Sequence, residues 1–158
     1  MNPKAKILLD LAVARGLTVT TAESCTGGMI AAAITDIAGS SAAFGFGFVT
    51  YADSAKVALL GIDPALIARH GAVSAETAAA MAGGALARSG ADRAVAVTGV
   101  AGPGGGSATK PVGTVWFGLA RRDGATLTER QVFPGDRAAI RSATVDRALD
   151  LLIASLQK

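Results

Sequence analysis

The sequence predicts an α/β fold: a single domain, residues 1–158, with one mixed β-sheet and helices on both of its faces. Three observations predict it. Short apolar strand segments alternate with helical segments, which is the order expected of crossover connections. An Asp-Gly pair at 123–124 separates the last two strand segments and is typical of an antiparallel hairpin. The 158 residues include 35 alanines and 20 glycines but only 4% aromatic residues, so we expect an interior in which backbones approach closely.

The first predicted elements surround a polar turn. Residues 3–15 have the period of an amphipathic helix, which ends at Gly16. A β-branched strand follows over 18–22. It leads into the polar turn 23–26, and the small residues from Gly27 to about Ile37 predict the next helix.

The middle of the chain is predicted to contain one strand and three helices. The apolar run 44–51 predicts a buried strand that carries three phenylalanines on one face, Phe44, Phe46 and Phe48. The helices follow over 53–60, 64–71 and 74–89, with Asp53 and Ser74 as the expected N-caps.

The last part of the chain is predicted to contain three strands and one helix. A strand over 94–98 runs into the glycine-rich loop 102–107. Strands over 112–121 and 126–133 form the hairpin, and Asp136 is expected to cap a final helix that extends to Gln157.

Composition excludes several classes of protein and site. One cysteine and one histidine exclude a disulfide framework and a Cys/His zinc site, and we expect neither a metal nor a cofactor. The apolar stretch 29–49 carries one charge, Asp36, but glycine and serines interrupt its centre, so we interpret it as a helix and a strand rather than a membrane span. The net charge of +3 is too small and too scattered for a nucleic-acid-binding protein. It suits a small anionic ligand, and we expect a cytoplasmic protein.

The segment Thr-Ala-Glu-Ser-Cys-Thr-Gly-Gly at 21–28 is the first candidate site. A strand that enters a polar turn before a helix exposes a hydroxyl, here that of Ser24, at the carboxyl edge of a sheet. Backbone N–H groups at the start of the helix are able to hold an oxyanion or a phosphate. The alternative interpretation is an ordinary helix cap, which the local sequence alone favours.

A nucleophilic Ser24 requires a base, and few residues are available. His70 is the only histidine, and its place at a predicted helix end favours a capping role over a catalytic triad. Lys56 follows a strand that we expect to be buried, where desolvation would lower the pKa of its amine; the alternative is a surface lysine. Cys25 is a rival nucleophile at a helix N-terminus, and its alternative is a small residue packed beneath the turn.

Two further segments are candidates for ligand binding. The loop that begins at Thr98 and Gly99 and continues through Gly102 matches neither a Walker A motif nor a dinucleotide fingerprint. Loops this rich in glycine at the end of a strand are usually functional, although a plain connection is the alternative. Arg137 and Arg141 lie one turn apart near the start of the last helix, which indicates either a phosphate site or a solvated charged face.

Together these segments resemble the C-terminal domain family of the competence/damage-inducible protein CinA, and the resemblance covers essentially the whole chain. It depends on motifs in matching order: Thr-Ala-Glu-Ser-Cys-Thr-Gly-Gly at 21–28, Asp-Ile-Ala-Gly-Ser-Ser at 36–41, Gly-Phe-Val-Thr-Tyr at 47–51 with Lys56, His-Gly-Ala-Val-Ser at 70–74, Thr-Gly-Val-Ala-Gly-Pro at 98–103, Lys-Pro-Val-Gly-Thr-Val-Trp at 110–116 and Gly-Asp-Arg at 135–137. Stand-alone members of the family are nicotinamide-nucleotide amidohydrolases. The resemblance therefore implies deamidation of nicotinamide mononucleotide to nicotinate mononucleotide and ammonia, in pyridine nucleotide recycling.

The resemblance also implies residue roles. Ser24 would be the nucleophile, Lys56 the general base, and Tyr51 an assistant in proton transfer, with Thr98 nearby. Backbone N–H groups at the four residues Cys25, Thr26, Gly27 and Gly28 would hold the oxyanion. The substrate phosphate would bind either the loop at Gly99 and Gly102 or the pair Arg137 and Arg141, and the sequence leaves both open.

The chain departs from the family pattern at Gly45-Phe46, where relatives usually carry an acidic residue and an arginine. This departure leaves the substrate preference and the assembly open, although family members tend to form homodimers or higher homo-oligomers. It also motivates a second hypothesis, a nucleotide-binding or regulatory module without catalysis. A third is an amidase that depends on Cys25.

Overall fold

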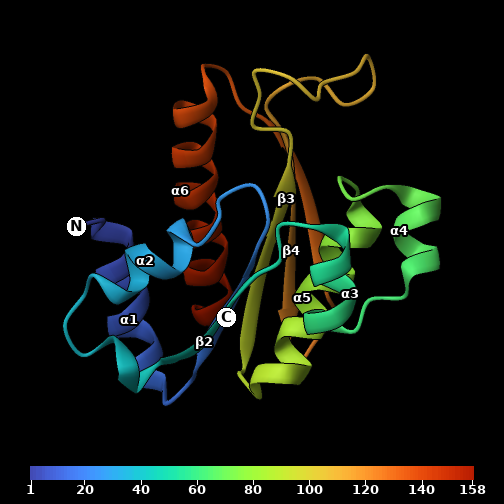
Figure 1. Cartoon of the computed structure of the whole chain (residues 1–158). Helices are drawn as coiled ribbons and strands as arrows, with labels where there is room; N and C mark the ends of the chain where they lie inside the picture. Colours follow the sequence, from blue (N-terminus) through green and yellow to red (C-terminus); the bar gives the residue numbers. More distant parts are fainter.

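A five-stranded mixed sheet forms the centre of the molecule, as the computed structural model shows for residues 1–158 (Figure 1). The strands lie in the order β2-β1-β3-β4-β5. The first three of these are mutually parallel, whereas β4 and β5 form an antiparallel hairpin at one edge. The bounds are β1 Val19–Glu23, β2 Phe44–Val49, β3 Arg93–Gly99, β4 Thr114–Arg121 and β5 Leu127–Val132.

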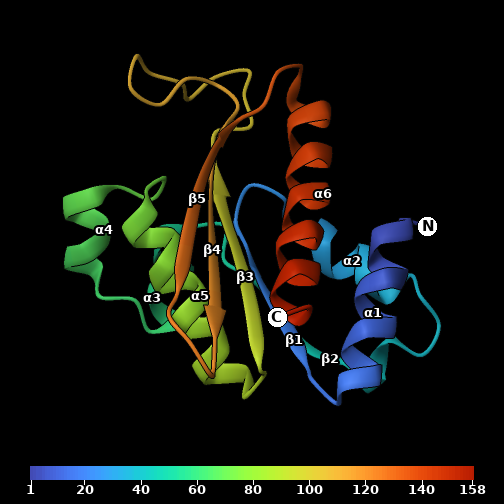
Figure 2. The ribbon, with the colours of Figure 1, turned by 180° about the vertical axis from the view of Figure 1, so that it is seen from behind.

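Helices cover both faces of the sheet (Figure 2). One face carries α1 (Pro3–Arg15), α2 (Met29–Thr35) and α6 (Arg137–Leu156), and the other carries α3 (Asp53–Leu60), α4 (Pro64–His70) and α5 (Ala75–Ser89). A short 3-10 helix, η1 (Ser40–Ala42), precedes β2. The predicted fold class is therefore confirmed. None of the helices combines the length and the apolar character that a membrane span requires.

The abundance of alanine and glycine sets how closely the layers pack. Beneath α5 the core is largely alanine and includes Ala82, Ala85 and Ala94. A methyl group added at Gly118 of β4 would overlap the carbonyl oxygen of Ala78 on α5. Helix α5 thus lies on the sheet with no room for a side chain between them, as the composition predicts.

The strand over 44–51 differs from its prediction in two ways. It is an edge strand rather than a buried one, and the side chain of Phe46 is 54% exposed. Its pairing with β1 contains an irregularity that adds one residue to β2. Phe44 therefore packs on the side of α1, α2 and α6, whereas Phe46 and Phe48 stack on each other and Phe48 packs on the opposite core. Alternation cannot predict a bulge, because the extra residue reverses the faces that follow it.

Most helix ends lie where the sequence places them, and two do not. Gly16 ends α1 in the left-handed conformation, and the side chains of Ser74 and Asp136 cap α5 and α6. Asp53 is the first residue of α3 rather than its cap, since Ala52 occupies the N-cap position. Helix α2 begins at Met29 rather than near Gly27 because the two glycines before it have positive φ angles and extend the turn.

Candidate active site

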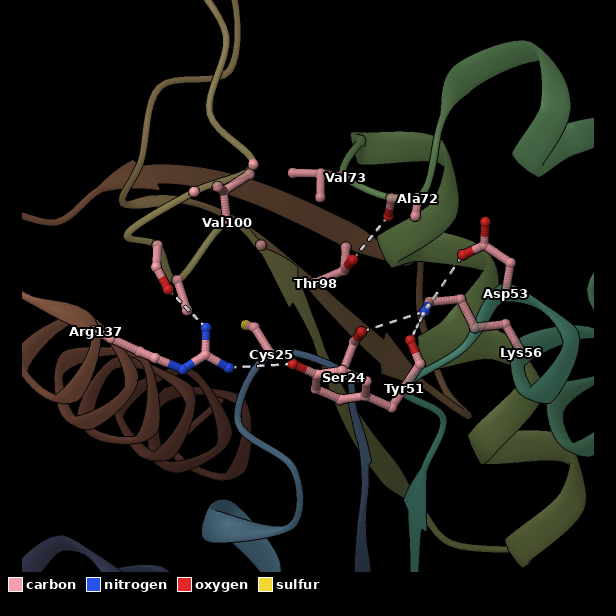
Figure 3. Close-up of a pocket in the computed structure, with 15 residues that line it drawn as sticks. Ser24, Cys25, Tyr51, Asp53, Lys56, Ala72, Val73, Thr98, Val100 and Arg137 are labelled. Atoms are coloured by element: carbon pink, nitrogen blue, oxygen red, sulfur yellow. Dashed lines mark hydrogen bonds and ion pairs between the residues drawn. The ribbon is translucent and has the colours of Figure 1, made fainter.

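A cavity of about 310 Å³ lies at the carboxyl ends of β1 and β3. The connection after β1 crosses one face of the sheet through α2, and the connection into β3 crosses the other face through α5. In open α/β sheets, such a switch point leaves a crevice at which ligands bind. Side chains from the β1–α2 turn, α3, the end of β3, the glycine-rich loop and α6 meet there (Figure 3).

The turn after β1 brings Ser24 to the cavity. Gly27 and Gly28 have φ angles of 59° and 105°, which other residues rarely adopt, and they let the chain reverse before α2. The backbone N–H groups of Cys25, Thr26 and Gly28 make no hydrogen bond to another residue. The turn therefore presents a hydroxyl together with three of the four backbone donors that the sequence predicts, because the N–H of Gly27 donates to the carbonyl of Ser24 at 3.1 Å.

Glu23, the buried last residue of β1, anchors this turn. Its carboxylate is fully buried and accepts hydrogen bonds from Thr26 Oγ1 at 2.6 Å, Ile30 N at 2.8 Å and Ala31 N at 3.0 Å. Helix α2 has glycine at its N-cap and no side-chain cap of its own. Glu23 thus satisfies the free donors of the first helical turn. Sequence reasoning missed this role, for which the signal was a carboxylate at the end of a β-branched strand followed by a glycine cap.

Arg141 of helix α6 is a second anchor of the same turn. It donates from Nε to the carbonyl of Cys25 and from Nη2 to the carbonyl of Thr26, both at 3.1 Å. These bonds connect α6 to the turn that carries Ser24. Arg141 does not line the cavity, so the structure places it in a supporting position rather than a ligand-contacting one.

Lys56 is the one hydrogen-bond partner of the Ser24 hydroxyl. Its side chain is 1% exposed, and Nζ lies 3.2 Å from Ser24 Oγ. Nζ also donates to the carbonyls of Thr50 at 2.9 Å and Tyr51 at 3.2 Å. A neutral amine has two N–H donors, so when both carbonyls accept one, the nitrogen lone pair is left for the hydroxyl of Ser24.

Burial lowers the pKa of the Lys56 amine below its usual value, because the charged form loses its hydration. The carboxylate of Asp53 acts in the opposite direction, with Oδ1 3.8 Å from Nζ. Because burial has the larger effect, a greater fraction of this amine than of an exposed lysine is neutral, and so able to accept a proton, near neutral pH.

Cys25 has the opposite behaviour from that expected of a nucleophile. Burial raises the pKa of its thiol to about 11, because the thiolate is poorly solvated there. The side chain is 5% exposed. The geometry therefore favours the alternative interpretation, a small residue packed at the turn.

The phenol of Tyr51 and the guanidinium of Arg137 meet at one side of the cavity, while the main chain of Tyr51 lies beside Lys56 (Figure 3). Arg137 donates from Nη2 to Tyr51 Oη at 3.2 Å and from Nη1 to the carbonyl of Gly102 at 2.7 Å. The phenol of Tyr51 thus contacts Arg137, and it is the main-chain carbonyl of Tyr51 that contacts Lys56. Neither partner of Arg137 is acidic, so its charge is not neutralised by a carboxylate.

The remaining predicted residues separate into two groups. Thr98, Gly99 and Gly102 line the cavity, and Thr98 donates its hydroxyl to the carbonyl of Ala72 at 2.7 Å. Thr26, Gly27 and Gly28 belong to the turn but do not line the cavity.

Two other candidates lie outside this cavity. His70 ends α4 before Gly71, as predicted, and is 3.7 Å from Glu76. Gly45 and Phe46 lie on the outer edge of the sheet beside a separate hollow of about 270 Å³. No group of three or more His, Cys, Asp or Glu side chains is arranged to hold a metal ion.

The fold and the site define an α/β protein with a serine and a buried lysine paired at the switch point of its sheet. The chain belongs to the CinA C-terminal domain family, whose model matches residues 1–156. It is 60% identical over 128 residues to "Nicotinamide-nucleotide amidohydrolase PncC" of Enterobacter agglomerans, a match that covers 81% of this chain and 78% of the relative. The protein of the same name from Escherichia coli K12 is 55% identical over 88% of this chain and 84% of the relative.

Solved structures and longer relatives agree with this assignment. The competence/damage inducible protein CihA from Agrobacterium tumefaciens superposes with a TM-score of 0.92 and is 48% identical over 100% of this chain and 98% of that one. A "CinA-like protein" of Akkermansia muciniphila is 54% identical over 90% of this chain, which spans only 34% of that relative.

Proposed function

We propose that this chain hydrolyses the carboxamide of nicotinamide mononucleotide to nicotinate mononucleotide and ammonia, with Ser24 as nucleophile and Lys56 as base. The observation that carries the proposal is the contact between Lys56 Nζ and Ser24 Oγ at 3.2 Å, beside a cavity, with the amine desolvated. The names of relatives that are 55–60% identical support the choice of substrate.

In the first half of the reaction, neutral Lys56 takes the hydroxyl proton of Ser24, and Oγ attacks the carboxamide carbon. The carbonyl oxygen becomes an oxyanion, which the free N–H group of Cys25, the one of these donors whose residue lines the cavity, is suited to hold. The protonated amine then gives its proton to the leaving nitrogen, so that ammonia departs and an ester on Ser24 remains.

In the second half, Lys56 acts on water in the same way. It accepts a proton from the water that attacks the ester carbon, and the resulting ammonium returns a proton to Ser24 Oγ as the C–O bond breaks. The carbonyls of Thr50 and Tyr51 hold Nζ in place through both steps. Tyr51 thus assists proton transfer through its main chain in this scheme.

For the substrate phosphate, the structure favours Arg137 over Arg141. Arg137 lines the cavity and has only neutral hydrogen-bond partners, whereas Arg141 is engaged with the turn. Gly102 and its neighbouring glycines let the ligand approach the backbone beside Arg137, and Thr98 lines the same cavity above Ser24 in Figure 3.

The test is to incubate the purified chain with nicotinamide mononucleotide and to quantify ammonia and nicotinate mononucleotide. Ser24→Ala and Lys56→Met should each lower kcat by about 10³-fold or more, because a nucleophile and its base act as a unit. Ser142→Ala and Lys6→Met, at exposed positions away from the cavity, are the matched controls. Failure of the unmodified chain to form product, or full turnover by Ser24→Ala, would overturn the proposal. Calorimetric binding without turnover would instead support the non-catalytic module.

A further inference from the structure

We propose that the carboxylate of Asp53 makes this cavity selective for amides carried on a positively charged aromatic ring. This inference rests on the proposed function, because it assumes that the carboxamide binds beside Ser24. It concerns a residue to which neither the sequence motifs nor the proposed chemistry assign a role in binding or catalysis.

The placement of charges around the cavity is asymmetric (Figure 3). Three charged side chains line it, Asp53, Lys56 and Arg137, and Asp53 is the only acid among them. Asp53 and Lys56 lie on α3 at one side, and Arg137 lies at the other side, where it contacts Tyr51 and Gly102. The Asp53 side chain is 61% exposed, so its carboxylate is accessible to a ligand.

The proposed reaction leaves this carboxylate without a counter-charge. Lys56 Nζ is the one cation in contact with it, at 3.8 Å. To accept the proton of Ser24, the amine has to be neutral, and the negative charge of Asp53 then stands alone beside the reacting group. The site in its reactive protonation state is therefore complementary to a cation.

Nicotinamide mononucleotide carries such a cation close to its carboxamide. Its ring nitrogen carries the ribose and is permanently charged, and it is two ring bonds away from the carbon that bears the carboxamide. The carboxamide at Ser24 would bring this ring within range of the Asp53 charge on α3, while the phosphate would reach Arg137 on the opposite side of the cavity. The carboxylate product gains a negative charge near Asp53, which favours its release.

A second role of Asp53 has to be separated from this one. The same carboxylate raises the pKa of Lys56, so its removal in the unmodified chain also changes the charge of the amine. The comparison therefore belongs in a Lys56→Met background, where no amine titrates and no turnover is expected. Lys56→Gln, which keeps donors for the Thr50 and Tyr51 carbonyls, is the second background if Lys56→Met does not fold.

The probes are nicotinamide mononucleotide and its reduced 1,4-dihydro form, which has the same phosphate, ribose and carboxamide but a neutral ring. Calorimetry gives the Kd of each with and without Asp53→Asn. We expect Asp53→Asn to weaken binding of the cationic form by about five- to tenfold, the effect of a unit charge pair at roughly 6 Å in a half-exposed site. Binding of the reduced form should change by less than about twofold.

Asp10→Asn, which removes an exposed carboxylate on α1, is the matched control and should change neither Kd. Equal weakening of both ligands by Asp53→Asn, or no change in either, would overturn the inference, and so would failure of both to bind. Turnover by the unmodified chain is measured separately. Its absence would refute the proposed function, whereas turnover with unchanged selectivity would refute only the role of Asp53.

Discussion

Replacing Arg141 by alanine would detach the turn that carries Ser24 from helix α6. The guanidinium donates to the carbonyls of Cys25 and Thr26 at 3.1 Å each, and it makes no contact with the cavity. The substitution therefore removes support from the proposed nucleophile without removing a residue that lines the cavity. We expect kcat to fall while KM for the substrate changes little.

The two hydrogen bonds of Arg141 set the size of the expected loss in stability and of the expected loss in kcat. Each bond from a charged donor contributes about 1.5–3 kcal/mol, and water will solvate the freed carbonyls in part, so the free energy of unfolding should fall by about 2–4 kcal/mol. For a chain of this length that lowers Tm by roughly 4–15 °C. A displacement of the turn by about 1 Å would lower kcat by on the order of 10²-fold.

Thermal unfolding and ammonia release, measured on the same preparations, separate stability from catalysis. Arg147→Ala is the matched control, because it lies on the same helix and loses two bonds to Glu129, at 2.6 and 2.7 Å, away from the turn. That pair is partly exposed, so its loss should cost only about 1 kcal/mol and leave kcat unchanged. Arg141→Lys should recover part of the lost rate. If Arg141→Ala lowers kcat no more than Arg147→Ala does, the supporting role is wrong.

Three further outcomes follow from the site. Asp53→Asn removes the charge that raises the pKa of Lys56, so the acid limb of the kcat/KM profile should move to lower pH; an unmoved or raised limb would contradict the assignment of Lys56 as base. Cys25→Ala should retain most of the amidase activity, and iodoacetamide should react slowly at pH 8, because the pKa of the thiol is about 11; rapid inactivation would argue for a catalytic thiol. Glu23→Ala should lower the free energy of unfolding by about 3 kcal/mol or more, measured by urea titration, because it leaves the Thr26 hydroxyl and two helix N–H groups unpaired; a loss below about 1 kcal/mol would show that the anchor is dispensable.

The fold was largely predictable because its boundaries depend on local chemistry. Gly16 ends a helix and Asp136 begins one for reasons contained within four residues, and the Asp-Gly pair at 123–124 fixes the hairpin. The environment of β2 was not predictable in this way. An apolar run has the same pattern at the centre of a sheet and at its edge, and only the strand order decides how Phe46 is exposed.

The candidate site was likewise predictable only in part. The resemblance singled out Ser24 and Lys56, and the structure places their side-chain ends 3.2 Å apart, although 32 positions separate them in the chain. What the sequence left open was the direction in which side chains point. From the sequence, Arg137 and Arg141 were equally good candidates for the phosphate site, because they lie one helical turn apart. In the structure, α6 directs Arg137 into the cavity and Arg141 onto the turn that carries Ser24. The expected homo-oligomer stays a prediction.

The anchors of the Ser24 turn affect how the site meets its substrate. Because Glu23 and Arg141 hold the turn in shape, its conformational freedom is lost when the chain folds. A substrate then arrives at donors that are already oriented, and none of its binding free energy is consumed in ordering them. Folding thus preorganises the Ser24 turn, and we expect the turn to keep this conformation for as long as the buried core beneath it stays folded.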